Sequence, residues 1–129
     1  MFKILVTTAL LGLLAIGLGA FGAHALKEIL SIAGLESFQT GVFYQFIHVI
    51  MIFIIWAGSC FTEKQAKQLS YLFLMGIFFF SGSIYLIHLT EIDVKKIWFV
   101  TPTGGLLFMM GWGYMFYIFL KKMTQNQKK

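Results

Sequence analysis

The chain has 129 residues, of which 59% are hydrophobic and only 12% are charged. A soluble domain carries about 25% charged residues, so this composition excludes an ordinary water-soluble domain and indicates a protein that lies in a bilayer. The net charge of +5 comes from lysines that flank apolar runs, which is a topology signal and does not predict a nucleic-acid-binding face.

Four stretches without a charged residue follow one another along the chain, at 4–26, 37–62, 68–90 and 97–120. Each is longer than the roughly 20 residues that cross a hydrocarbon core, and the short breaks between them make successive spans antiparallel. The sequence therefore predicts an all-α fold, an integral membrane four-helix up-down bundle that forms a single domain over 1–129. The predicted transmembrane helices cover about 4–25, 39–61, 69–89 and 101–120, followed by a flexible tail at 121–129.

The first stretch also resembles a secretory signal, because Lys3 precedes a leucine-rich run and Ala23-His24-Ala25 follows it. Its apolar run is longer than the core of a signal peptide, so we predict a retained transmembrane helix. Small residues recur on or beside one face of that helix, at Gly12, Ala15, Gly19 and Ala23. Such a stripe lets two helix backbones approach closely in lipid.

The first loop and the later segments carry further signals. The amphipathic loop at 26–35 predicts a short helix on the outer surface. In the fourth segment, Thr101 is predicted to cap the helix and Pro102 to lie in its first turn. Helix packing is predicted at Gly76 and Ser83 in the third segment and at Gly104 in the fourth.

The distribution of lysines predicts the orientation of the spans. Seven of the lysines lie in the N-terminus, the second loop and the tail, which share one side of the membrane. The other side carries three, Lys27, Lys95 and Lys96. Because cytoplasmic segments carry the excess of basic residues, both termini are predicted to be cytoplasmic.

Polar side chains inside the spans form the candidate site. Tyr44, Gln45 and His48 share one face of the second helix, which is expected to point into the bundle because lipid offers no hydrogen-bond partners. His24 ends the first span and Thr101 begins the fourth, both toward the same outer side. These five residues therefore predict a polar pocket or clasp in the outer half of the membrane.

Several interpretations of this site stay open. The imidazoles and the amide either hydrogen-bond neighbouring helices and set their register or have a binding role. In that role the histidines act as a proton relay or bind a ligand, and the amide lines a pocket for a lipid head group or quinone. Two histidines on different helices would also suffice for axial haem ligation. A zinc site would need a third ordered ligand, for which His88 or Glu36 could serve. The single cysteine has no partner, and no metal site is predicted.

The chain shows no recognisable catalytic motif, which favours a protein that is not an enzyme but leaves an activity open. All five acidic residues lie in the loops. Proton-coupled carriers usually hold an acid within the membrane, so this placement argues against proton-coupled transport.

Motifs occur in a fixed order along the chain: Gly19-Ala20-Phe21-Gly22-Ala23-His24, Gln39-Thr40-Gly41, Tyr44-Gln45-x-x-His48, Phe80-Ser81-Gly82-Ser83-Ile84-Tyr85 and Phe99-Val100-Thr101-Pro102-x-Gly104-Gly105. With these motifs the chain resembles the bacterial inner-membrane family of domain of unknown function 423, also called uncharacterised protein family 0382. The resemblance implies a small multi-pass protein of the bacterial inner membrane, with a small mitochondrial transmembrane relative, and it supplies no activity. Two positions depart from the family pattern, namely Phe43 in place of a charged residue and His88 in place of a small one.

The leading functional hypothesis is a structural or accessory component of the membrane. Its expected partners are the lipid bilayer, further copies of itself or a larger membrane complex, with no nucleic acid and no cofactor. The alternative is a binding or transport unit for a small molecule, lipid or quinone, with a polar pocket that opens on the outer side. A second alternative is a redox subunit that holds haem or quinone on the same residues.

Overall fold

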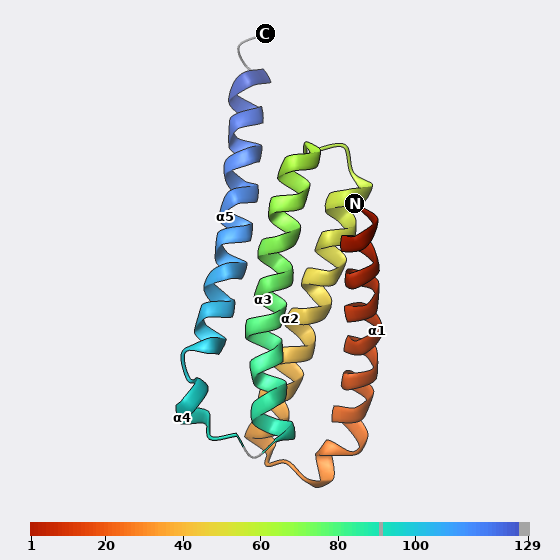
Figure 1. Cartoon of the computed structure of the whole chain (residues 1–129), viewed down its shortest axis with the longest axis vertical. Helices are drawn as coiled ribbons and strands as arrows, with labels where there is room; N and C mark the ends of the chain where they lie inside the picture. Colours follow the sequence, from red (N-terminus) through yellow and green to blue (C-terminus); the bar gives the residue numbers. More distant parts are fainter. Residues whose placement is uncertain (91, 127–129) are drawn as a thin grey trace.

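The computed structural model describes residues 1–90 and 92–126, and within them the chain is helical and contains no strand (Figure 1). The long helices are α1 (Phe2–His24), α2 (Ile32–Ala57), α3 (Glu63–Leu89) and α5 (Val100–Asn126). The connections between them hold a turn of 3-10 helix, η1 (Leu26–Glu28), and a short helix, α4 (Val94–Ile97). The four long helices are long and apolar enough to cross a membrane, which confirms the predicted all-α membrane bundle.

The first loop differs from the prediction of a surface helix at 26–35. It holds only η1, and α2 already begins at Ile32. The start of α2 is set by Ser31, whose hydroxyl accepts a hydrogen bond from the Gly34 amide at 3.1 Å and so caps the helix. Residues 32–35, which were expected on the surface, therefore form the first turn of α2.

The second loop lies at 58–62, earlier in the chain than the hydropathy pattern predicts. An extended Gly58 follows the end of α2, and Thr62 precedes the start of α3. Thr62 and Gln65 form a capping box, in which each side chain accepts a hydrogen bond from the backbone amide of the other residue. Hydropathy marks the part of a helix that lies in lipid, whereas such caps decide where the helix begins.

Helix α5 continues past the predicted end of the fourth span at 120 and reaches Asn126. The ammonium group of Lys122 donates a hydrogen bond to the backbone carbonyl of Cys60, which ties this end of α5 to the second loop. Residues 121–126 of the tail predicted to be flexible are therefore helical, and 127–129 lie outside the described residues. At its other end the helix begins at Val100, so Thr101 lies inside α5 and does not cap it.

The long helices pack in the order in which they occur in the chain. Helix α1 packs against α2, α2 against α3, and α3 against α5, so that α1 and α5 form the two edges of the arrangement (Figure 1). Both termini lie at the same end, as an up-down topology requires. The core lies where α2, α3 and α5 meet, and it includes Ile52, Leu69 and Phe73, each of them 0% exposed.

Glycines allow α3 and α5 to approach closely. A Cβ atom at Gly104 would lie 2.2 Å from the backbone nitrogen of Phe80, a distance that no side chain tolerates. A Cβ atom at Gly76 would lie 2.4 Å from the ring of Phe108. Gly111, which the sequence did not mark as a packing residue, leaves a similar notch for an aromatic ring of α3. The interface is therefore built from glycines on one helix that receive the rings of the other.

The small-residue face of α1 packs against α2, with one correction to its predicted members. Gly12 and Gly19 face valine side chains of α2, and Ala15 is buried. Ala23 is exposed, and Gly22 packs against α2 in its place. A strict spacing of four residues drifts around a helix by about 40° per step, whereas an alternation of three and four keeps to one face.

Candidate functional site

Gln45 joins three helices from a buried position on α2, where only 2% of the residue is exposed. Its side-chain nitrogen donates a hydrogen bond to the backbone carbonyl of Leu11 in α1 at 2.7 Å. Its side-chain oxygen accepts a hydrogen bond from the hydroxyl of Tyr85 in α3, also at 2.7 Å. One amide group on α2 is thus bonded to both neighbouring helices.

His48 lies on the same helix, and its hydrogen-bond partners determine its tautomer. Its Nδ1 atom is 2.7 Å from the backbone carbonyl oxygen of Tyr44, and its Nε2 atom is 3.2 Å from Nε1 of Trp112 in α5. A carbonyl group only accepts a hydrogen bond and an indole N–H only donates one. The proton of the neutral imidazole is therefore on Nδ1, and Nε2 accepts from Trp112. Both ring nitrogens are engaged within the protein.

Aromatic rings from α2, α3 and α5 surround this imidazole. The rings of His48 and Phe108 stack with their centroids 3.6 Å apart, and Phe73 packs against the imidazole at 5.1 Å. Tyr44 lies against Phe80 at 4.8 Å. Stacked and tilted aromatic pairs add about 0.5–1.5 kcal/mol beyond the burial of their surface, so this cluster holds α2, α3 and α5 together.

A groove of about 580 Å³ opens beside the cluster, between α2 and α5. We call it the α2–α5 groove; its walls are formed by Tyr44, His48, Phe80, Pro102, Gly105, Leu106, Phe108, Met109 and Trp112. Its surface is apolar apart from a few polar atoms. The hydroxyl of Tyr44 has no hydrogen-bond partner among residues 1–90 and 92–126. The groove therefore suits an apolar or amphiphilic molecule.

Thr101 is placed against α3 and not in the α2–α5 groove. Its hydroxyl is 2.6 Å from the hydroxyl of Ser83, which in turn donates to the backbone carbonyl of Phe80 at 2.9 Å. Because the single proton of the Ser83 hydroxyl points to that carbonyl, Thr101 donates to Ser83. This bond connects the start of α5 to α3, where Ser83 was predicted to pack.

His24 lies apart from the other predicted site residues. It ends α1 and is exposed. Near that end of α1, Gly22 packs on Phe38 of α2. His48 lies ten residues after Phe38, which corresponds to about 15 Å along the axis of α2. Metal–nitrogen bonds are about 2 Å long, so His24 and His48 of this structure do not face a common metal centre. Among the described residues there is also no group of three or more His, Cys, Asp or Glu side chains that would hold a metal ion.

The structure thus brings Tyr44 and His48 together in the wall of the α2–α5 groove, directs Gln45 to α1 and α3 instead, and leaves His24 and Thr101 elsewhere. It adds Tyr85 and Trp112 as hydrogen-bond partners that the sequence does not predict. Tryptophans of membrane proteins gather at the membrane interfaces, whereas Trp112 lies in the middle of a predicted span. This unusual position is the sequence signal that indicates a buried partner for its indole N–H.

Comparisons with known proteins agree on one family. The model of the family described as "Protein of unknown function (DUF423)" matches residues 18–105. A UPF0382 membrane protein of Staphylococcus saprophyticus is 39% identical over 81% of this chain and 85% of its own length. The UPF0382 membrane protein YwdK of Bacillus subtilis is 35% identical over 81% and 85% of the two chains. The UPF0382 inner membrane protein YgdD of Escherichia coli is 34% identical over 86% and 84%. No solved structure matches the chain.

Proposed function

The chain belongs to the DUF423 family of multi-pass membrane proteins, and we propose that its role is that of a structural or accessory component of the bacterial inner membrane. The observation that supports this role best is the bonding of Gln45. Its side-chain nitrogen is bonded to Leu11 of α1 and its side-chain oxygen to Tyr85 of α3, so this buried amide connects three helices. Across the described residues, no buried side-chain nitrogen or oxygen is left without a partner.

The exposed edge of the arrangement supports lateral association with other membrane proteins. Only 17% of the α1 span is buried, compared with 33% of the spans in α2 and α3. The large side chains of Leu10, Leu13 and Ile16 are more than half exposed on α1. In the membrane this surface contacts lipid, a further copy of the chain or a helix of a larger complex.

We place both termini in the cytoplasm. At the end where both termini lie (Figure 1), the described lysines are Lys3, Lys64, Lys67, Lys121 and Lys122. The opposite end carries Lys27, Lys95 and Lys96. The excess of basic residues marks the cytoplasmic side of a membrane protein. A reporter enzyme fused after the last residue tests this orientation, because activity of a periplasm-dependent reporter would contradict it.

A site-specific photo-crosslinker tests the accessory role. We would introduce it at Leu13 of α1, which is 67% exposed, and as a matched control at Phe78 of α3, which is 70% exposed. If α1 contacts a defined partner in native membranes, position 13 yields a discrete protein adduct and position 78 does not. Only lipid adducts at both positions would contradict the proposal.

A second candidate role is the binding of an amphiphile, such as a quinone, in the α2–α5 groove. It is favoured by Tyr44, which forms part of the groove wall with His48 and Trp112 and whose hydroxyl has no hydrogen bond within the described chain. Extraction of the purified protein and of a Tyr44→Phe variant tests this role. A lipid-soluble molecule that co-purifies with the first and is lost from the second supports it, and equal contents contradict it.

A further inference from the structure

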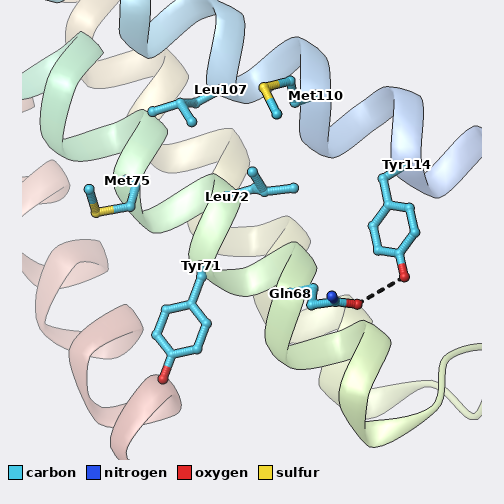
Figure 2. Close-up of a pocket in the computed structure, with 7 residues that line it drawn as sticks. All are labelled: Gln68, Tyr71, Leu72, Met75, Leu107, Met110 and Tyr114. Carbon is cyan, nitrogen blue, oxygen red and sulfur yellow. Dashed lines mark hydrogen bonds between the residues drawn. The ribbon is translucent and has the colours of Figure 1, made fainter.

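A second groove lies between α3 and α5, on another face of α5 (Figure 2). It has a volume of about 520 Å³, and we call it the α3–α5 groove. Leu72 and Met75 of α3 and Leu107 and Met110 of α5 line its apolar part. These residues lie well inside the two spans, so the apolar part faces the hydrocarbon region of the membrane.

One end of this groove is polar. There the hydroxyl of Tyr114 donates a hydrogen bond to the side-chain oxygen of Gln68 at 3.0 Å, across the gap between α5 and α3 (Figure 2). Gln68 lies near the start of α3 and Tyr114 in the second half of α5. Because these helices are antiparallel, the polar end is the one that carries both termini (Figure 1). The groove thus changes from apolar to polar along its length, as a lipid molecule does.

Each of the two helices that form the groove carries a lysine beyond its polar end. Lys64 lies one helical turn before Gln68, and Lys121 lies seven residues, or close to two turns, after Tyr114. Both lysines are exposed. Among residues 1–90 and 92–126, an ion pair joins Lys67 to Glu63 at 2.8 Å. Lys64 and Lys121 have no acidic partner within the same residues. Two uncompensated positive charges therefore flank the mouth of the groove at the level where head groups lie.

We propose that the α3–α5 groove binds an anionic glycerophospholipid. An acyl chain lies along Leu72, Met75 and Met110, the glycerol region meets the Gln68–Tyr114 pair, and the phosphate lies between Lys64 and Lys121. Charge complementarity selects an anionic lipid over a zwitterionic one, because the amine of a zwitterionic head group would oppose the two lysines. Basic clusters beside membrane spans recognise anionic lipids in this way. This lipid site goes beyond the structural or accessory role proposed above and does not depend on it.

Native mass spectrometry of the full chain in detergent tests the proposal. The chain is titrated with phosphatidylglycerol and, separately, with phosphatidylcholine of the same acyl chains, and the retained lipid is counted. One lysine near a head group contributes about fivefold in affinity, so the double variant Lys64→Gln/Lys121→Gln is expected to bind phosphatidylglycerol about 25-fold more weakly. The double variant Lys64→Arg/Lys121→Arg keeps the charges and is expected to bind as the wild type does.

Two control variants distinguish lipid binding at this groove from non-specific electrostatic binding of anionic lipid. The variant Lys95→Gln/Lys96→Gln removes the same charge at the opposite end and is expected to leave binding unchanged. The variant Met110→Trp fills the groove and is expected to reduce the retention of both lipids, with helix content checked by circular dichroism. Equal affinity for the two lipids would overturn the proposal, as would an equal loss in both lysine-to-glutamine pairs. Competition by glycerol phosphate as effective as that of the lipid would also overturn it, because the acyl chain would then contribute nothing.

Discussion

The imidazole of His48 and the phenyl ring of Phe108 stack face to face, with their centroids 3.6 Å apart and their planes 4° from parallel. This contact joins α2 to α5, two helices that do not follow one another in the chain. The edge of the imidazole is fixed at the same time by the Tyr44 carbonyl and the Trp112 indole. Two of these three contacts on the His48 ring come from α5, and Phe73 of α3 packs against the same ring.

Replacement of His48 by phenylalanine separates the stacking from the hydrogen bonds. Phenylalanine retains the stacking on Phe108 but leaves the Trp112 N–H without its acceptor. We expect the free energy of unfolding to fall by about 1–3 kcal/mol, the cost of an unpaired polar group in an apolar site. Thermal unfolding in detergent measures this loss. If small molecules that co-purify with the protein are unchanged in the variant, the role of His48 is structural, whereas their loss would favour a binding role.

Gln45 and Tyr85 offer a double-mutant cycle across α2 and α3. Gln45→Leu removes both inter-helix hydrogen bonds at nearly constant volume and is expected to destabilise the protein by about 1–3 kcal/mol. Tyr85→Phe removes the hydroxyl that this change leaves unpaired. The double variant should therefore lose less than the sum of the two single changes, by about 0.5–2 kcal/mol. Additive losses in chemical unfolding would show that the bond at 2.7 Å contributes no coupling.

Two glycines of α5 provide a matched test of helix packing. At Gly104 a Cβ atom would lie 2.2 Å from the Phe80 backbone nitrogen, whereas at Gly113 it would meet nothing within 4 Å. Gly104→Ala should force α3 and α5 apart and destabilise the protein by about 1–3 kcal/mol. Gly113→Ala should stabilise it by up to about 1 kcal/mol, because alanine is the better helix former. Unfolding by heat or denaturant distinguishes these signs, and a similar response in both variants would contradict the close approach.

His24 is expected to have little influence on the folded state. It is exposed at the end of α1, and surface substitutions away from specific contacts usually change stability by less than about 0.5 kcal/mol. His24→Ala should therefore unfold as the wild type does. Addition of haemin to both proteins, followed by an absorption spectrum, examines the redox alternative. A Soret band in the wild type that is lost in the variant would show that His24 is a ligand.

The number and order of the membrane helices were predictable from the sequence, and so was the family. Hydropathy and charge act locally, since any stretch of about 20 apolar residues finds its lowest free energy as a helix in lipid. The helix ends were less predictable. Ser31 and Thr62 extend helices beyond the apolar stretches, because hydrogen bonds to the first turns and not hydropathy decide where a helix begins.

The candidate site was predictable only in part. A polar group in a membrane span needs a partner, so the sequence identified Gln45 and His48 as residues that must be bonded to something. It identified neither Leu11 nor Trp112 as the partner, because a backbone carbonyl carries no sequence signal and the rotation of α5 about its axis depends on packing.

The sequence by itself thus determined that this chain is a four-span membrane protein with Tyr44, Gln45 and His48 on one face of its second span. Only the tertiary structure decided that Gln45 bonds to two neighbouring helices, that His24 lies apart from His48, and that α1 and α5 form opposite edges. The physical reason is that helices in lipid associate through packing and inter-helix hydrogen bonds. Those contacts depend on how close two backbones come, as they do at Gly104 and Phe80, and that distance is a property of the assembled bundle.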